Sequence, residues 1–422
     1  MMNTTYYYQA KEGRSVTRIQ QGSREYRRVT LALFLGALSV YASLYVTQPI
    51  LPLLSEAFGI TPAHASLSVS VATVSLALSQ VLVGPLADSL GRKPVMTFAM
   101  LAAGVIGVAA ALAPSFGPFL FLRFVHGLVM AGLPATAMAY LAEEIDARHL
   151  GAAMGLYIAG NSVGGLSGRI IAGMAADFWG WRAAVGSIGV MSLACALWFT
   201  RTLPPSRHFR PQPLQPKRLV LSLLRAWGDP LLRTLYMVGF LAMGSFVALY
   251  NYVSYHLMAA PYNLSPALVG WIFLLYLAGT FSSAFLGRLS DRYGRAPMLG
   301  LSLAIQLTGA TVSLAGPLLV KILGIAIFTF GFFGAHSIAS GWVGQRAVRD
   351  KGAASALYLF TYYLGSSLAG TTAGLFWMRF HWPGVVGFIA CFLVAALGLA
   401  ALSRRLEAST PPQQHAVSPT QR

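Results

Sequence analysis

The chain has 422 residues, of which 56% are hydrophobic and only 10% are charged, and its mean hydropathy is +0.63. This composition excludes an ordinary soluble protein, and because twelve membrane spans of about 20 residues would use about 240 positions, it also excludes large domains outside a membrane. The formal net charge of +18 would suggest a nucleic-acid partner in a soluble chain. Here the basic residues lie between apolar segments, so membrane topology explains the charge, and we expect no nucleic-acid partner.

Taken in chain order, the apolar runs predict twelve transmembrane helices in a lipid bilayer. A polar tail, residues 1–28, leads into a first apolar run of full-span length, so we expect no cleaved signal peptide. The first six spans, which make up a bundle at 29–201, are 29–53, 65–87, 94–113, 117–140, 150–174 and 180–201. The last six, which make up a bundle at 232–403, are 232–257, 266–289, 296–315, 317–341, 352–376 and 382–403. A proline-rich linker, 202–231, joins the bundles, and a polar tail, 404–422, follows them.

The positions of lysine and arginine predict the orientation, because cytoplasmic loops retain an excess of both. If the N-terminus is cytoplasmic, the tails, the linker and the even-numbered loops hold 25 of the 30 Lys and Arg residues. Only Arg182, Lys321 and Arg379 lie at the opposite ends of spans, and Arg123 and Arg169 lie within spans. We therefore expect the linker and both termini, 1–28 and 404–422, to be cytoplasmic.

The two halves of the chain repeat each other, which is typical of transporter folds with a site between repeats. One loop motif ends span two, and its counterpart ends span eight 203 residues later. The residues of the two copies are Gly84, Asp88, Gly91, Arg92 and Lys93 in the first, and Gly287, Asp291, Arg292, Gly294 and Arg295 in the second. A glycine-rich stretch, 160–165 in span five, is similarly echoed by 365–370 in span eleven, and its glycines predict close packing against a neighbouring helix.

These motifs resemble those of the major facilitator superfamily over the whole chain. Arg123-x-x-His126-Gly127 resembles the Arg-x-x-Gln-Gly motif of span four, and the segment 177–182 matches the approach to span six. Within the family the chain is most similar to the drug:proton-antiporter and sugar-efflux branches, above all to YnfM-type bacterial inner membrane transport proteins. The resemblance implies an all-α fold of two pseudo-symmetric six-helix bundles. It also implies a monomer in the bacterial inner membrane that exposes a central site to each side in turn, with the proton as coupling ion and no other cofactor.

The repeated loops are the candidate gating elements. Gly84 and Gly287 would let helices approach closely, and Gly91 and Gly294 would permit a tight turn. In the family the aspartate of this loop holds the start of a helix in the opposite half. Carried over, Asp88 would meet the start of span eleven near Gly352, and Asp291 the start of span five near Gly151, where a helix N-terminus stabilises a carboxylate. The alternative is that the loops only fix topology through their basic residues.

Several side chains inside the spans are candidate cargo contacts. Arg123 and Arg169 are charges within the membrane, which by default indicates function, although Arg123 could instead snorkel to the outer surface. His126 lies on the same helix face as Arg123 and could carry a proton, or it could be a neutral hydrogen-bonding residue. Polar and aromatic stripes, which could alternatively serve packing, add further candidates. These are Tyr45 and Gln48 in span one, Asn161 in span five, Tyr250, Asn251 and Tyr255 in span seven, His336 in span ten, and Tyr358 and Tyr362 in span eleven.

The twelve acidic residues all lie in a tail, in a loop or near the end of a span. An interior with arginines and histidines but no carboxylate favours a neutral polar or anionic cargo over a permanent cation. Cys195 and Cys391 are too few for a metal site, and no H-E-x-x-H or phosphate-binding G-x-x-x-x-G-K-[ST] motif is present, so we expect no metal and no enzyme. We predict a proton-coupled exporter of a small molecule, with a sugar or organic-acid importer as the nearest alternative and a membrane sensor as a weaker one.

Overall fold

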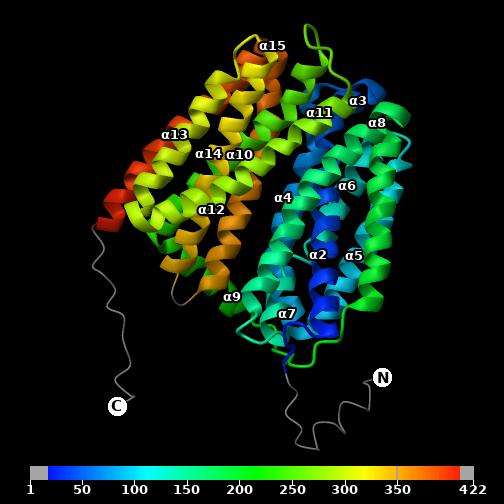
Figure 1. The fold of residues 1–422 in the computed structure, drawn as a ribbon, viewed down its shortest axis with the longest axis vertical. Coiled ribbons are helices and arrows are strands. Elements are labelled where there is room, and N and C mark those ends of the chain that lie inside the picture. Colours follow the sequence, from blue (N-terminus) through cyan, green and yellow to red (C-terminus); the bar gives the residue numbers. More distant parts are fainter. Residues whose placement is uncertain (1–17, 348–349, 409–422) are drawn as a thin grey trace, which may run out of the picture. The chain divides into compact units, whose positions relative to one another are not determined.

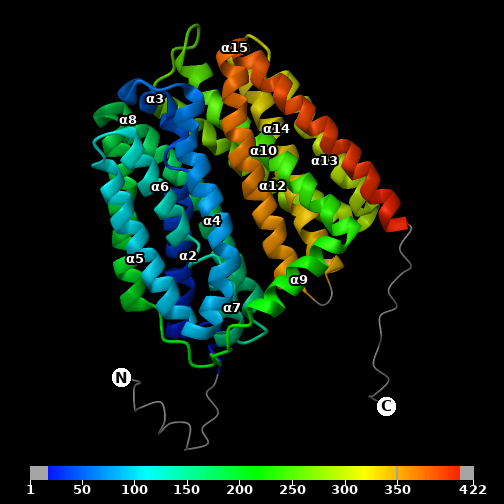
Figure 2. The same cartoon turned by 180° about the vertical axis from the view of Figure 1, so that it is seen from behind.

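The structure is a computed structural model that describes residues 18–347 and 350–408. Within these ranges its regular elements are helices, apart from one isolated bridge between Ile19 and Ile145. The chain forms two compact units, which are described here separately (Figures 1 and 2). Unit 1 comprises Met1–Gln215 with Leu264–Phe273, and unit 2 comprises Pro216–Asn263 with Leu274–Arg422. The predicted all-α fold is confirmed.

Unit 1 is a bundle of long apolar helices. Its elements are α2 (Arg24–Leu44), η1 (Gln48–Ile50), α3 (Leu51–Phe58), α4 (Pro62–Leu90), α5 (Arg92–Ala111), α6 (Phe116–Met130), α7 (Ala137–Glu144), α8 (Leu150–Thr202) and α11 (Pro266–Ile272). Helix α8 contacts α2, α5 and α11. We call the end that carries Arg24, Arg92 and Arg201 the basic end of unit 1.

Unit 2 contains the remaining helices. They are α9 (Pro216–Gly228), α10 (Pro230–Met258), α12 (Tyr276–Tyr293), α13 (Arg295–Val312), α14 (Leu318–Arg346) and α15 (Lys351–Ala408), while the short η2 (Phe273–Leu275) begins at the boundary between the units. Helix α10 packs mainly on α15, and α13 packs on α14. The end that carries Arg295, Arg346 and Arg404 is the basic end of unit 2.

The described helices account for the twelve predicted spans. Eight segments are long and apolar enough to cross a membrane, and two of these, α8 and α15, bend sharply at Gly180 (φ 78°) and His381 (φ 51°). Figure 1 shows that the two arms of each helix run back from the bend in the same direction, so each helix supplies two spans. The other two spans are α13 and the interrupted pair of α6 and α7.

In three places the helices differ from the prediction, and a proline lies in each of them. The first span starts at Arg24, not 29, and is divided by a short 3-10 turn at Pro49. The fourth span, predicted as one helix over 117–140, is broken after Met130, where Pro134 removes a main-chain donor. Within the predicted linker, Pro216 stands at the first position of helix α9, where proline is tolerated.

Candidate functional site

A buried cluster in unit 1 brings together three of the predicted cargo residues. Arg169 of α8 is 2% exposed and donates from Nε to Gln48 Oε1 at 2.8 Å, and from Nη1 to the carbonyl of Gly165 at 2.5 Å. Its guanidinium carbon lies 4.3 Å from the ring centre of Tyr45 and 4.9 Å from that of Phe273. Gln48 is placed here because α2 ends at Leu44 and the chain turns through η1. The cluster combines a cation, an amide and two aromatic faces, which suits a polar ligand.

Arg123 of α6 is also buried, at 1% exposure. It donates to three main-chain carbonyls: Ser43 at 3.0 Å, Leu44 at 2.6 Å and Ser68 at 3.0 Å. Its Nη1 is 3.3 Å from His126 Nδ1, so the predicted shared face of the two residues is confirmed. Burial this deep excludes the snorkelling alternative. These hydrogen bonds tie Arg123 to the end of α2 and to α4.

The glycines of α8 pack directly on α2, which confirms the predicted role of this stretch. A Cβ built on Gly160 would lie 2.5 Å from the carbonyl oxygen of Phe34, and one on Gly164 would lie 2.5 Å from Leu38 Cα. Asn161 lies beside them, and its buried Oδ1 has no hydrogen-bond partner among the described residues. Residues 160–164 also fit the G-x-S-x-G pattern of hydrolases, but they lie inside a helix and not on the strand-to-helix turn that this chemistry needs.

In unit 2, His336 of α14 meets Tyr358 and Tyr362 of α15. His336 Nδ1 lies 3.0 Å from the hydroxyl of Tyr358, and its ring centre lies 4.7 Å from that of Tyr362. Phe332 adds a stacked ring 6.1 Å from His336, and the absence of a side chain on Gly239 of α10 makes room for the ring of Tyr358. These residues line a narrow pocket between α10, α14 and α15 that their side chains nearly fill. Three of the predicted cargo residues therefore share one pocket.

The three predicted residues of α10 do not share a single cluster. Tyr250 is buried, and its hydroxyl lies 2.7 Å from Thr329 Oγ1 among the rings of Phe246 and Tyr276. The ring centre of Tyr255 lies 5.9 Å from that of Trp377, with the two rings tilted. Asn251 is fully buried in the same helix. Tyr255 thus packs in the aromatic cluster of α15, apart from Tyr250 and His336.

The loop between α4 and α5 is held by charge. Asp88 pairs with Arg92, and Arg92 in turn donates to Glu143 Oε1 at 2.9 Å. Gly91 adopts φ 101°, so the predicted tight turn is confirmed, and Lys93 donates to the carbonyl of Leu203 at 2.5 Å. By contrast, a Cβ built on Gly84 would meet no atom within 4 Å. The prediction of close helix packing at this glycine was therefore wrong. Glu143 has no role in the sequence prediction because it lies 51 residues from Arg92.

The equivalent loop of unit 2 has the same turn but lacks, among the described residues, the ion pairs of the loop in unit 1. Gly294 adopts φ 90°, and the Arg292 guanidinium lies 5.4 Å from the ring of Tyr293. A Cβ on Gly287 would be in ordinary contact with Ser337 at 3.4 Å. Among the described residues, Asp291 and Arg295 form no ion pair within unit 2. The position 203 residues after Glu143 is occupied by Arg346, which binds Asp229 at 2.8 Å instead.

Two further acids at the basic end of unit 1 were not predicted to have structural roles. Glu144 is 1% exposed and accepts hydrogen bonds from the main-chain N–H groups of Arg207 and His208, which fixes the start of the linker. Asp146, in the turn before α8, accepts hydrogen bonds from the side chain and main chain of Arg148 and from the amide of Gln20. These hydrogen bonds hold the pKa of the Asp146 carboxyl well below its usual range.

This arrangement, long apolar helices in two units that each contain a buried polar and aromatic cluster, is that of a multi-pass membrane transporter. The model of the Major Facilitator Superfamily matches residues 33–260 and 235–421, and the chain belongs to this family. It is 48% identical to the uncharacterized MFS-type transporter YybF of Bacillus subtilis, over 91% of this chain and 95% of the relative. It is also 48% identical to the inner membrane transport protein YnfM of Escherichia coli, over 92% of this chain and 94% of that protein.

The solved structures agree on the fold. A bacterial homologue of the human lysosomal transporter Spinster, in an inward-facing and unoccupied conformation, has a TM-score of 0.80 at 18% identity, covering 93% of this chain and all of that chain. The Escherichia coli xylose transporter XylE has a TM-score of 0.70 at 15% identity, covering 92% of this chain and 98% of that one. The predicted resemblance to the superfamily and to YnfM-type proteins, and the predicted fold of two six-helix bundles, are confirmed.

Proposed function

We propose that this chain is a secondary active transporter of the bacterial inner membrane that exports a small molecule in exchange for protons. The observation that carries the proposal is membership of the superfamily together with 48% identity to an inner membrane transport protein along nearly the whole chain. Transport by this fold requires a site that opens to each side in turn. We propose a monomer with its linker and termini in the cytoplasm, the proton as coupling ion and no other cofactor.

The cargo we propose is neutral and polar or anionic. Arg169, Gln48 and Tyr45 offer donors and an aromatic face in unit 1, and His336, Tyr358 and Tyr362 offer hydrogen bonds and rings in unit 2. The twelve acidic residues of the sequence all lie in tails, loops or span ends. The sequence therefore offers no carboxylate in the middle of the membrane to bind a permanent cation. The proton would then be carried by a histidine or by an acid at a helix end.

The proposal is tested by flux into proteoliposomes. Purified protein is reconstituted, and uptake of radiolabelled sugars, organic acids and cationic dyes is measured with and without an imposed pH gradient. Acceleration of a neutral or anionic solute by a proton gradient of opposite direction supports proton-coupled export. Co-directional accumulation with protons would support import, and transport of cationic dyes alone would contradict the proposed cargo class.

For gating, we propose that Asp88 acts as a latch of the transport cycle. Asp88→Asn is expected to lower transport at least about tenfold, because the neutral amide loses the charge that a helix N-terminus stabilises. The fold should persist, since Glu143 still binds Arg92. The measurement is initial flux per molecule of inserted protein.

The control for this variant is Asp146→Asn, which neutralises another acid at the basic end of unit 1. Its flux should remain close to that of the wild type. Glu143→Gln separates the latch from simple loss of the Arg92 ion pairs, because it removes the other partner of Arg92 and leaves Asp88 charged. Wild-type flux in Asp88→Asn, or an equal loss in Glu143→Gln, would contradict the latch.

The pocket of His336 gives a second functional prediction. Tyr358→Phe removes the hydroxyl that lies 3.0 Å from His336 Nδ1 and keeps the ring. If the pair binds cargo, the KM of transport should rise about three- to tenfold, the effect of one lost hydrogen bond, with little change in maximal rate. Tyr252→Phe is the matched control, since it also removes one buried hydroxyl from unit 2, one that donates to the Gly370 carbonyl at 3.0 Å. An equal KM change in both variants would mean that the effect is structural.

A further inference from the structure

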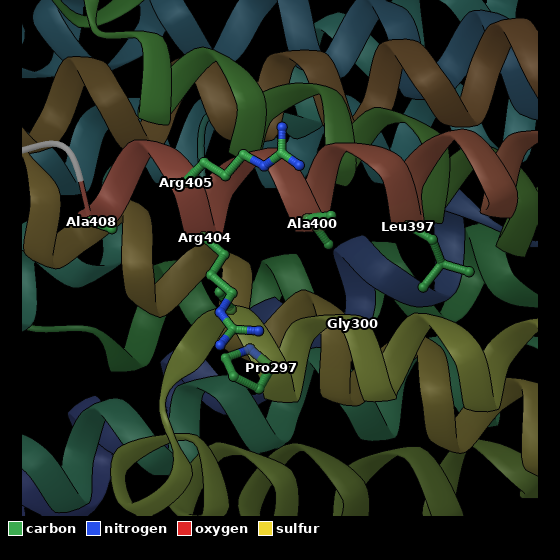
Figure 3. Close-up of a pocket in the computed structure, with 9 residues that line it drawn as sticks. Pro297, Gly300, Leu397, Ala400, Arg404, Arg405 and Ala408 are labelled. Atoms are coloured by element: carbon green, nitrogen blue, oxygen red, sulfur yellow. The ribbon is translucent and has the colours of Figure 1, made fainter.

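Unit 2 carries a surface groove between α13 and the last turns of α15, at its basic end. The groove measures about 520 Å³ and is lined mainly by small or apolar side chains, together with two arginines. Its lining residues are Ala296, Pro297, Gly300, Leu397, Ala400, Ala401, Arg404, Arg405 and Ala408. In Figure 3 the side chains of Leu397 and Ala400 point from α15 toward α13. Gly300 leaves the floor open, because a Cβ at this position would meet no atom within 4 Å.

The two arginines put positive charge at one end of this apolar groove. Figure 3 shows the Arg404 side chain extending from α15 toward Pro297 of α13, whereas the Arg405 side chain runs along α15 and does not point toward α13. Among the described residues, neither Arg404 nor Arg405 forms an ion pair, and Glu407 pairs with neither of them. Both guanidinium groups therefore keep their donors for an anion outside the described chain.

The surroundings of the groove match a lipid environment. Leu301 and Leu402, next to the groove on α13 and α15, are both 43% exposed, and Val394 is 59% exposed. In a chain that spans a membrane, exposed apolar side chains of this kind contact acyl chains. An apolar channel between two helices that ends at Arg404, with Arg405 nearby, has the chemistry to bind a phospholipid with an anionic headgroup.

We propose that this groove binds one anionic phospholipid, with an acyl chain between α13 and α15 and its phosphate on Arg404, close enough to Arg405 to be attracted by its charge. The C-terminal segment 409–422 is a poor alternative occupant, because its sequence contains no acidic side chain and few large apolar ones. The proposal depends on the membrane-spanning fold alone, and it stands or falls separately from the proposed cargo and coupling.

The test is native mass spectrometry of the full chain in detergent, titrated with phosphatidylglycerol or with zwitterionic phosphatidylethanolamine. At the first site, phosphatidylglycerol should bind more tightly than phosphatidylethanolamine. Arg404→Gln/Arg405→Gln should weaken that binding about 25-fold, since each arginine near an anionic headgroup contributes a factor of about five. Gly300→Leu keeps the charge but fills the groove. It should weaken the binding of both lipids at least about fourfold, which is the effect of one lost buried methylene.

The matched control is Lys217→Gln/Arg218→Gln, which removes an adjacent basic pair of unit 2 from α9, outside the groove. It should change the binding constant of the first lipid by no more than about twofold relative to the wild type, which is too small a change to reflect a lost direct contact. An equal loss in the control pair, or unchanged binding in both groove variants, would overturn the proposal. Displacement of the lipid by millimolar inorganic phosphate would also overturn it in favour of a free-anion site. If a chain that ends at Thr410 bound the lipid more tightly, the proposal would also be overturned, because the C-terminal segment would then be the occupant of the groove.

Discussion

Gly164→Leu is expected to prevent stable assembly of unit 1, with a loss of about 3 kcal/mol or more of stability. Even the Cβ of an alanine at this position would overlap the main chain of Leu38, 2.5 Å from its Cα and 2.7 Å from its carbonyl carbon. Main chain cannot move aside as a flexible side chain can. Helices α2 and α8 would have to separate along their whole contact.

The measurement is the monodisperse fraction on size-exclusion chromatography and the thermal midpoint of the detergent-purified protein. Gly155→Leu is the control on the same helix, because a Cβ there would meet no atom within 4 Å. It should retain the wild-type midpoint within a few degrees, since a surface substitution changes stability by about 0.5 kcal/mol or less. A Gly164→Leu protein as stable as Gly155→Leu would show that α2 and α8 do not pack as the structure has them.

The glycine spacing also explains why this contact could be predicted from sequence. Gly160, Gly164 and Gly168 recur every fourth residue, so they lie on one face of a helix, and each meets the main chain of α2, at Phe34, Leu38 and Ala42 respectively. Unit 2 repeats the first of these contacts, where a Cβ on Gly365 would lie 2.7 Å from the carbonyl carbon of Phe240. Periodicity within one helix is visible in the sequence, and it is sufficient to identify a packing face.

Helix interruptions were harder to predict than helices. Hydropathy averaged over about 20 residues finds each apolar run, but it takes no account of whether the main chain inside the run is continuous. Pro49 and Pro134 supplied the local signal for the breaks in the first and fourth spans, yet proline is also tolerated inside membrane helices, as Pro85 is in α4. The break after Leu44 shapes the candidate site, because it places Gln48 beside Arg169.

Partners in the candidate site could be predicted only where they lie on one helix. The spacing of Tyr358 and Tyr362 indicates a shared face, and the structure stacks their rings 6.1 Å apart. His336 joins them from α14, 22 residues away, and Gln48 joins Arg169 across 121 residues. Such pairs depend on how helices pack in space, which the 3.6-residue period of one helix does not contain.

Arg123 illustrates how the structure changes the meaning of a predicted residue. An arginine inside a span suggests a cargo or proton site. In the structure its guanidinium meets the carbonyls of Ser43 and Leu44, in the last turn of α2, where helix carbonyls lack partners within their own helix. A third carbonyl, that of Ser68 in α4, completes the set. The fixed fork of the guanidinium can serve all three at once, which a lysine ammonium does less well.

Arg123→Met is therefore expected to lower stability by at least about 3 kcal/mol, because three buried carbonyls each lose a charged donor and a buried unsatisfied group costs about 1–3 kcal/mol. Arg123→Lys should recover part of the loss. Arg182→Met is the control, since Arg182 donates to a single carbonyl, that of Ala113 at 3.1 Å, and its loss should have a clearly smaller effect. The thermal midpoints of the three variants and the wild type, measured in detergent, give the order of their stabilities. If Arg123→Met keeps the wild-type midpoint but loses transport, Arg123 acts on cargo or protons and not on the end of α2.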